Sequence, residues 1–231
     1  FLLRIACLPR MTADVARALS GEAAAGRLLV NLALNNYFVS EVRSDEGRVY
    51  QLHPLLRDFL RGRAQQEMPE VFESAHLKRA AELLREAGQV EDAVSLLLEC
   101  RDWGAIARIA EVEAESLLLQ GRTTTLGGWL DLLPAAILEA APILQVALAE
   151  CRARSAPREA RRRFEPALES FRRTGDAAGA IRSCCGLIDA IIFEFDDLAP
   201  LDHWCAQLID LLQENAGRVP ENIARAAAGA I

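Results

Sequence analysis

The chain has 231 residues, of which 52% are hydrophobic but only 6% aromatic, and its net charge is −7. The negative charge argues against a general nucleic-acid binder. Because Arg or Glu interrupts every apolar run, no run is long enough to cross a membrane, and no membrane contact is expected. The hydrophobic excess is mostly Ala and Leu, which favour helices.

The two ends of the chain bear on its origin. The opening residues, FLLRIACLP, do not have the pattern of a signal peptide, so we expect a cytoplasmic protein. The chain begins without a methionine and ends within a predicted helix, ENIARAAAGAI. We therefore interpret it as a fragment of a longer protein.

The cysteines follow no metal-binding pattern, since neither CxxC nor a Cys/His spacing occurs among them. Most lie in apolar helical runs, where free Cys acts as a small hydrophobe, and a reducing compartment is expected. One alternative is a redox-active pair formed by the two adjacent cysteines. The six are Cys7, Cys100, Cys151, Cys184, Cys185 and Cys205.

The first 66 residues are predicted to alternate helices with a hairpin. Thr12 suits an N-cap and Gly21 a helix end, which predicts a helix over 11–20. A second helix is predicted over 22–36, and two β-rich runs, YFVSEV and RVYQL, then flank the turn sequence SDEG. A third helix follows from Pro54 to about residue 63. This order of elements is typical of a small winged-helix unit.

Beyond Pro69 the sequence predicts helices only. Their expected ranges are 70–87, 90–100, 103–119, 123–133, 142–152, 157–173, 177–194, 199–216 and from 221 onward. Short turns separate them, which implies antiparallel neighbours.

The turns recur with a period close to that of tetratricopeptide repeats. Gly88, Gly121 and Ser155 lie 33 and 34 residues apart, and a repeat of about 34 residues is a pair of helices. The next turn, at Asp196-Asp197, follows after about 41 residues, so the array is irregular. Helix pairs that cannot bury their own apolar faces must stack, which predicts a superhelix with a groove.

His53 stands where the β-rich run VYQL meets the third helix. It is either a packing residue that lies against Tyr50 and binds a backbone carbonyl, or a group directed at a ligand. On the helix that follows, Arg57 and Arg61 share a face, and Leu56, Phe59 and Leu60 are predicted to face inward. The two arginines could dock another domain or be solvated, and Arg63 is expected to be solvated.

Nothing in the sequence indicates catalysis. It has no GxxxxGK[ST] phosphate loop, no GxSxG and no HExxH motif, so the chain is not expected to be an enzyme or to hold ATP or a metal by itself. His76 and His203 are expected on helix surfaces or between helices. The acids of Asp196-Asp197 are read as turn and cap residues.

Two further features have a structural and a functional interpretation. The run RARSAPREARRRFEPALESFRR is basic, but glutamates intervene and aromatic residues do not alternate with the arginines, so a solvated mixed-charge helix is favoured over a phosphate-binding face. Trp103, Trp129 and Trp204 fit packing between repeats. Alternatively, Trp103 and Trp129 line a groove for a ligand or partner.

Over residues 1–135, four segments in succession resemble one known family. The segments FLLRIACLPRMTADVARALSG, LLVNLALNNYFVSEV, VYQLHPLLRDFLRGR and the stretch from HLKRAAELLREAGQ to LLLQGR are similar to the large ATP-binding LuxR-type regulators, the class of the maltose-regulon activator. In that family a STAND-type ATPase module ends in a winged helix. A tetratricopeptide-like sensor array follows it, and a DNA-binding helix-turn-helix usually lies at the far C-terminus.

The resemblance implies a role for His53. In nucleotide-switch ATPases of this type, a winged-helix histidine at this junction contacts the β-phosphate of ADP and holds the closed, inactive state. An imidazole can donate to a phosphate oxygen, and a helix N-terminus favours an anion. The family commonly has a second aromatic or histidine beside it, where this chain has Pro54.

The sequence thus predicts a mainly α protein: a winged-helix subdomain over 1–66 with one β-hairpin, and a tetratricopeptide-like sensor domain over 67–231. The predicted function is that of a regulatory part of an ATP-dependent transcriptional activator. A small-molecule inducer or a regulatory protein would bind the repeats and bias an ADP/ATP switch, with Mg²⁺, in the parent's own ATPase domain. DNA would be bound only through a domain outside this chain, and ligand-dependent oligomers are possible. The alternative is a protein-interaction scaffold without a nucleotide switch.

Overall fold

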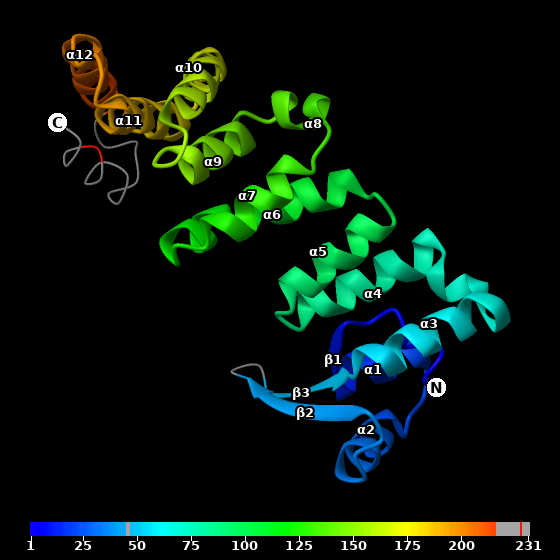
Figure 1. Ribbon diagram of the computed structural model, residues 1–231. Coiled ribbons are helices and arrows are strands. Elements are labelled where there is room, and N and C mark those ends of the chain that lie inside the picture. The colour runs from blue at the N-terminus through cyan, green and yellow to red at the C-terminus, as the bar shows by residue number, and fades with distance from the viewer. Residues whose placement is uncertain (45–46, 216–226, 228–231) are drawn as a thin grey trace. The chain divides into compact units, whose positions relative to one another are not determined.

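The protein is mainly helical in a computed structural model that describes residues 1–44, 47–215 and 227 (Figure 1). The described part holds one three-stranded antiparallel sheet and twelve α-helices. This confirms the predicted fold class. The turn of the hairpin at 45–46 and the helix predicted from 221 lie outside the description.

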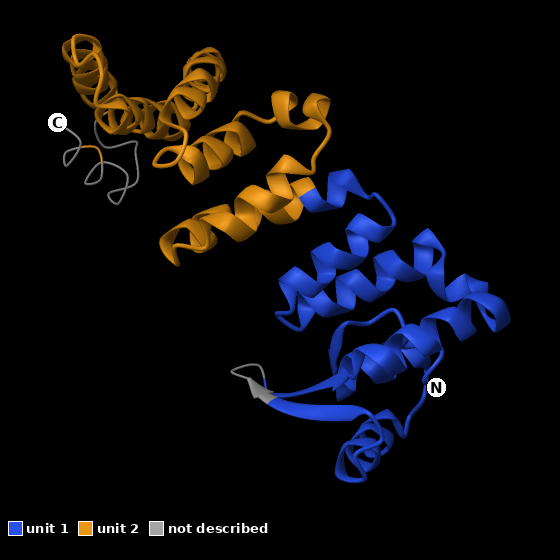
Figure 2. Ribbon diagram, in the orientation of Figure 1, with its two compact units in different colours: residues 1–106 blue, residues 107–231 orange. Residues whose placement is uncertain are grey.

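The described chain divides into two compact units, residues 1–106 and 107–231 (Figure 2). The boundary between the two units falls inside helix α6 (Trp103–Leu119). This division does not test the predicted domain boundary after residue 66, which stays a prediction.

The first unit begins with the winged-helix elements. They are the strands β1 (Arg10–Thr12), β2 (Val39–Ser44) and β3 (Gly47–Leu52) and the helices α1 (Ala13–Ser20), α2 (Ala25–Leu34) and α3 (Pro54–Glu67). The strand order is β1-β3-β2, so β3 lies in the middle of the sheet. The third strand is a correction to the predicted hairpin.

Strand β1 occupies residues that the sequence assigned to the first helix. Met11 pairs with Tyr50 of β3 and is completely buried, so the helix begins only at Ala13. Thr12 is nevertheless the N-cap, as predicted, because its side chain accepts a hydrogen bond from the Val15 N–H at 3.2 Å. Gly21 ends the helix with φ 72°, a conformation that glycine adopts without strain.

A helical hairpin completes the first unit. After the 3-10 turn η1 (Pro69–Phe72), helix α4 (Ser74–Glu86) packs against α5 (Val90–Glu99) and against α1. The prediction of one continuous helix over 70–87 was wrong, since Glu73 is extended with ψ 148° and separates η1 from α4. The Arg10 Nε–Asp92 Oδ2 distance of 2.8 Å ties β1 to α5.

The second unit continues the helical array. Its helices after α6 are α7 (Thr123–Asp131), α8 (Ala135–Ala140), α9 (Pro142–Arg152), α10 (Pro157–Thr174), α11 (Ala177–Glu194) and α12 (Pro200–Glu214). Successive helices α9 to α12 pack side by side, and α7 packs on α9. The short helix α8 was not predicted, because six residues are too few to show a periodicity.

The predicted turns lie where their period indicated. Gly88 and Gly121 adopt positive φ, of 79° and 71°, and Ser155 lies in the turn before α10. Each of the three stands two residues before a helix start, at Val90, Thr123 and Pro157 respectively. The assignment of the pairs to the tetratricopeptide type stays a prediction.

The core of the second unit is built on the contact between α10 and α11. Phe164 and Phe171 of α10 are buried against two glycines of α11. A Cβ at Gly186 would lie 2.3 Å from the Phe164 ring, and one at Gly179 would lie 2.5 Å from the Phe171 ring. No side chain fits at either position, so the two glycines let the helices approach closely.

We expect Gly186→Ala to destabilise the protein by about 1–3 kcal/mol, because Phe164 has to leave its position in a packed core. The matched control is Gly128→Ala in α7, where an added Cβ meets nothing within 4 Å. That change should stabilise by about 0.5–1 kcal/mol through helix propensity. Urea unfolding of the chain measures both. Equal effects of the two substitutions would contradict the packing argument.

Candidate functional site

His53 is the N-cap of α3 and follows β3 directly. Its backbone N–H donates to the Phe38 carbonyl at 2.7 Å, and its ring lies edge-on to the Phe38 ring at 5.9 Å between centroids. Its Nδ1 accepts from the Leu55 N–H at 3.3 Å. The side chain is exposed. The ring of His53 thus contacts Phe38, whereas the packing interpretation expected it to contact Tyr50.

The capping bond decides which nitrogen of His53 carries the proton. When Nδ1 accepts a hydrogen bond, the neutral ring holds its proton on Nε2. Nε2–H is then a donor, and it has no partner within the described part of the chain. In the first turn of α3, Pro54 has no N–H, the Leu55 N–H donates to the His53 ring and the Arg57 N–H donates to the His53 carbonyl, so the Leu56 N–H is the backbone donor that remains. A donor next to a helix N-terminus suits an anion such as a phosphate oxygen.

Large apolar side chains are exposed on the segments that meet at His53, which we call the His53 surface. Leu55 and Phe59 are 72% and 63% exposed, and they lie four residues apart on one face of α3. Tyr37 and Phe38, which precede β2, are 59% and 61% exposed. The prediction that Phe59 faces inward was wrong. Exposed apolar residues clustered in this way are typical of a contact surface.

The arginines of α3 point to partners inside the first unit. Arg61 makes a two-pronged bond to Glu99 of α5, at 2.8 and 3.3 Å, and its guanidinium lies 4.9 Å from the Phe72 ring centroid. Arg57 donates to the Cys7 carbonyl at 3.3 Å, and burial together with the charge of Arg61 lowers the pKa of Arg57. Arg63 pairs with Glu67 at 2.7 Å. The contacts of Arg57 and Arg61 tie α3 to its own unit, whereas the Arg63–Glu67 pair lies within α3.

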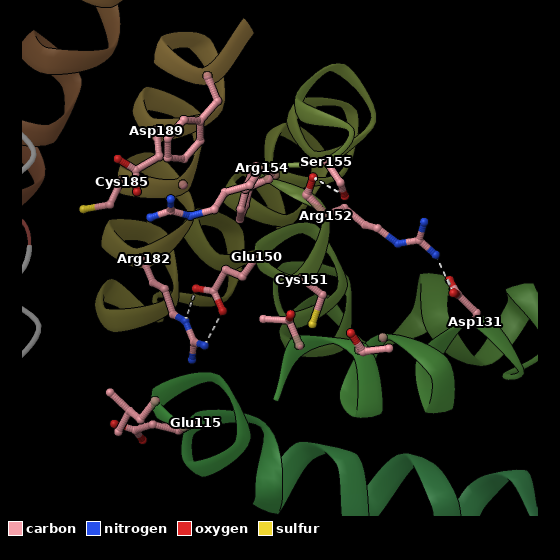
Figure 3. Close-up of a pocket in the computed structure, with 18 of the residues that line it drawn as sticks. Glu115, Asp131, Glu150, Cys151, Arg152, Arg154, Ser155, Arg182, Cys185 and Asp189 are labelled. Carbon is pink, nitrogen blue, oxygen red and sulfur yellow. Dashed lines mark hydrogen bonds and ion pairs between the residues drawn. The ribbon is translucent and has the colours of Figure 1, made fainter. Parts of the chain in front are cut away.

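The second unit contains a cleft of about 1220 Å³ (Figure 3). Residues of α6, α7, α9 and α11, of the turn between α9 and α10, and Phe164 of α10 line it. Its wall on α11 is a stripe at helical spacing, formed by Arg182, Cys185, Gly186, Asp189 and Phe193. The position of this stripe follows from the packing of Gly186 on Phe164.

Two ion pairs hold the cleft walls together. Arg182 of α11 and Glu150 of α9 form a bidentate pair, at 2.6 and 2.5 Å. Burial disfavours the charge on Arg182, but the bonds to Glu150 and the charges of Glu150 and Glu115 outweigh it and raise the pKa of Arg182. Arg152 bonds to Asp131 of α7. Two of the three arginines that line the cleft, Arg152 and Arg182, therefore have carboxylate partners.

The tryptophans do not line this cleft. Trp129 in α7 is 8% exposed and packs in the interior, and Trp103 at the start of α6 is half-buried. Both positions fit the packing interpretation. Their assignment to a ligand groove stays a prediction, and the cleft residues of α9 and α11 were not singled out from the sequence. A sequence pattern that could have indicated them is the set of charged residues at helical spacing in α11, considered together with Glu150, which lies 32 residues before Arg182.

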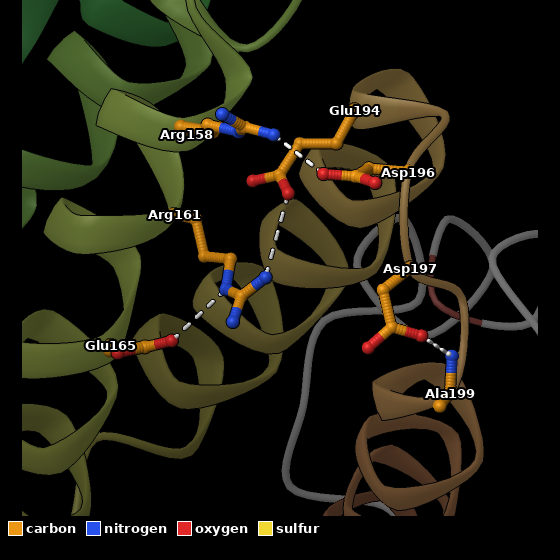
Figure 4. A network of polar contacts seen from close by, with 7 residues as sticks. All are labelled: Arg158, Arg161, Glu165, Glu194, Asp196, Asp197 and Ala199. Atoms are coloured by element: carbon orange, nitrogen blue, oxygen red, sulfur yellow. Dashed lines mark hydrogen bonds and ion pairs between the residues drawn. The ribbon is translucent and has the colours of Figure 1, made fainter.

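Most of the basic run lies in α10, where Arg158, Arg161 and Arg163 pair with acids (Figure 4 shows the first two). Arg158 bonds to Asp196 at 2.6 Å, and Arg161 contacts Glu165 at 3.3 Å and Glu194 at 3.6 Å. Asp197 accepts from the Ala199 N–H at 2.9 Å, as expected of a turn residue. These pairs agree with the mixed-charge interpretation.

Burial keeps the thiols of Cys7, Cys184 and Cys185 protonated. Burial raises the pKa of Cys7 and of Cys185 to about 12, and that of Cys184 to about 11. A thiol reacts as its thiolate, so these values argue against the redox alternative for the pair Cys184 and Cys185. Among the described residues no group of three or more His, Cys, Asp or Glu side chains could hold a metal ion.

The other two histidines lie on helices, and only His203 has side-chain partners among the contacts of the described residues. His203 in α12 lies 2.9 Å from the Gln207 amide nitrogen and stacks edge-on with Trp204. His76 in α4 is half-buried, and its Nε2 is buried without a partner. Both lie on helices, where the sequence placed them. No described helix has the length and apolar character that crossing a membrane requires.

Comparison with known proteins relates the first unit to a described family. Residues 1–72 match the family model of the MalT winged helix domain. Over 119 residues the chain is 34% identical to the HTH-type transcriptional regulator AlkS of Pseudomonas putida, which amounts to 49% of this chain and 13% of that regulator. No solved structure matches significantly. These findings support a relationship to the MalT-like regulators, and the chain corresponds to a small part of the length of the relative it matches.

The carboxyl group of Asp189 in the cleft should make the stability of the protein depend on pH. Burial raises the pKa of Asp189, and the charge of Arg154 offsets this in part. When folding raises the pKa of a carboxyl group, its protonated form is favoured in the folded state. Relative to its value at high pH, the free energy of unfolding is then greatest below the pKa of the unfolded state, and this gain is lost as the pH rises through the pKa of the folded state. Asp189→Asn should therefore raise the urea midpoint at pH 7 and leave it unchanged near pH 3. A difference that does not depend on pH would contradict this cause.

Proposed function

We propose that the chain is the winged-helix and sensor part of an ATP-dependent transcriptional activator of the MalT-like type. The match of residues 1–72 to the MalT winged helix domain supports the regulator class. The observation that carries the proposal is the placement of His53, whose Nε2–H is a free donor at the N-terminus of α3. The chain itself supplies no catalytic group in this proposal and acts in the cytoplasm.

In this mechanism His53 donates to a phosphate oxygen of ADP held in an ATPase domain of the full-length regulator. The capping bond from the Leu55 N–H fixes the ring so that its donor is available before the nucleotide arrives. The positive end of the α3 dipole adds a favourable field for the phosphate. His53 thereby stabilises the closed, ADP-bound state over the open one.

The His53 surface supplies the second contact of the closed state. Exposed Leu55 and Phe59 on α3, with Phe38 beside the histidine, offer an apolar face that the ATPase domain covers. Burying apolar side chains contributes roughly 1.5–3 kcal/mol each. Arg57 and Arg61 take no part in the docking, because their bonds lie within the first unit.

The helical array biases the switch. A ligand that binds the second unit favours the open state only by as much as it binds that state more tightly. Exchange of ADP for ATP with Mg²⁺ then permits oligomerisation, and DNA is bound through a domain outside these residues.

The sequence of the gene on either side of this segment gives the first test. We expect a GxxxxGK[ST] phosphate loop upstream and a helix-turn-helix downstream. Absence of both would favour the interaction scaffold and return His53 to a capping role alone.

Substitution of His53 in the full-length regulator separates capping from phosphate binding. His53→Asn keeps a side chain able to cap α3 but lacks the Nε2–H donor, and His53→Ala lacks both. Both variants should release ADP about ten-fold faster or more and raise transcription without inducer. The control is His203→Ala, an exposed histidine in α12. ADP retention by His53→Asn equal to that of the unchanged protein would rule out the phosphate contact.

A further inference from the structure

The charges that line the cleft do not all have partners inside it. Seven charged side chains line it, and four of them form the pairs Glu150–Arg182 and Asp131–Arg152. The other three are Glu115, Arg154 and Asp189, and none of them makes a direct ion pair within the described part of the chain. The cleft thus presents one cation and two anions that a ligand can match.

Arg154 is positioned by an aromatic ring. It lies in the turn after α9, and its guanidinium carbon is 5.0 Å from the centroid of the Phe193 ring on α11. Stacking holds the flat face of the guanidinium and leaves its N–H edge free. That edge has the geometry that binds a carboxylate with two parallel hydrogen bonds.

Asp189 lies one helical turn before Phe193 on the same wall (Figure 3). Arg154 influences it electrostatically, but the two do not form an ion pair. Burial without a direct partner raises the pKa of Asp189, which is the condition of a carboxylate that a cation would stabilise. A carboxylate and a guanidinium without direct ion-pair partners therefore line the cleft near Phe193, with Arg154 over its ring and Asp189 one helical turn before it.

We propose that the cleft binds a small zwitterion, whose carboxylate pairs with Arg154 and whose ammonium group pairs with Asp189. Its aliphatic body lies along Phe193. A ligand with only a positive charge would face Arg154 unmatched, and one with only a negative charge would face Asp189 and Glu115. This ligand class rests on the proposed function, in which the helical array is the part that senses a ligand.

The test uses the chain of residues 1–231 and isothermal titration calorimetry. The probes are the ω-amino acids from glycine to 6-aminohexanoate, whose two charges are separated by increasing lengths, at up to about 10 mM. Pentylamine and valerate carry one charge each and serve as matched probes. We expect saturable binding of at least one ω-amino acid and about ten-fold weaker or no binding of pentylamine and valerate.

Variants locate the binding. Arg154→Gln and Asp189→Asn should each weaken the ω-amino acid by about ten-fold or more, and the fold is checked by circular dichroism. Arg158→Gln removes an exposed arginine of α10 that does not line the cleft, and should leave binding unchanged. The proposal is overturned if no ω-amino acid binds, if the single-charge probes bind equally well, or if binding survives both cleft variants.

The outcome is separate from that of the nucleotide switch. The titration contains no nucleotide and does not involve His53, so a failure here leaves the phosphate contact standing. Conversely, ADP retention by the His53 variants would overturn the switch without changing the titration.

Discussion

The seating of Phe164 on Gly186 is the contact on which the second unit depends. It lets α10 and α11 approach until the ring meets backbone, and no larger residue fits at that position of α11. Because α11 is one rigid helix, fixing Gly186 also fixes Arg182 before it and Asp189 and Phe193 after it, all on the same face. The bidentate bond from Arg182 to Glu150 then sets the distance from α11 to α9. The cleft is a consequence of this packing.

In the first unit a single hydrogen bond has a comparable consequence. By accepting from the Leu55 N–H, His53 starts α3 and at the same time directs its proton to Nε2. Structural and functional interpretations of this histidine are therefore compatible. The cap is local and needs no other domain, whereas the donor it leaves free has no partner among the described residues.

Both sites contain side chains that have no partner in the described structure, although similar side chains elsewhere do have one. Several arginines have acidic partners on other elements, as Arg61 has Glu99 and Arg158 has Asp196, and such pairs hold elements together. At the cleft Arg154 and Asp189 lack direct partners, and at the His53 surface Leu55 and Phe59 are not covered. Leaving charges half-desolvated or apolar side chains exposed has a cost in stability, which binding of a partner offsets.

The sequence by itself determined the order of the elements, because capping residues, turn glycines and helical periodicity act over a few residues. Thr12, Gly21 and Pro54 each marked a helix end correctly, and Gly88 and Gly121 lie in the turns that their spacing indicated. The sequence also singled out His53, because the junction of β3 and α3 at which it lies is formed by neighbouring residues of the chain. Strand β1 was not predicted, because three residues are too few to show an alternating pattern and their pairing with β3 is a tertiary contact.

Only the tertiary structure decided which faces are buried and which charges meet. Phe59 satisfies the spacing of an inward residue, yet nothing in its unit covers it. Arg154 and Phe193 are far apart in sequence, and Arg182 finds Glu150 across two helices, so neither relation has a local signal. Periodicity assigns residues to a face of a helix, but the direction of that face depends on how helices pack, and here the packing depends on Phe164 and Gly186.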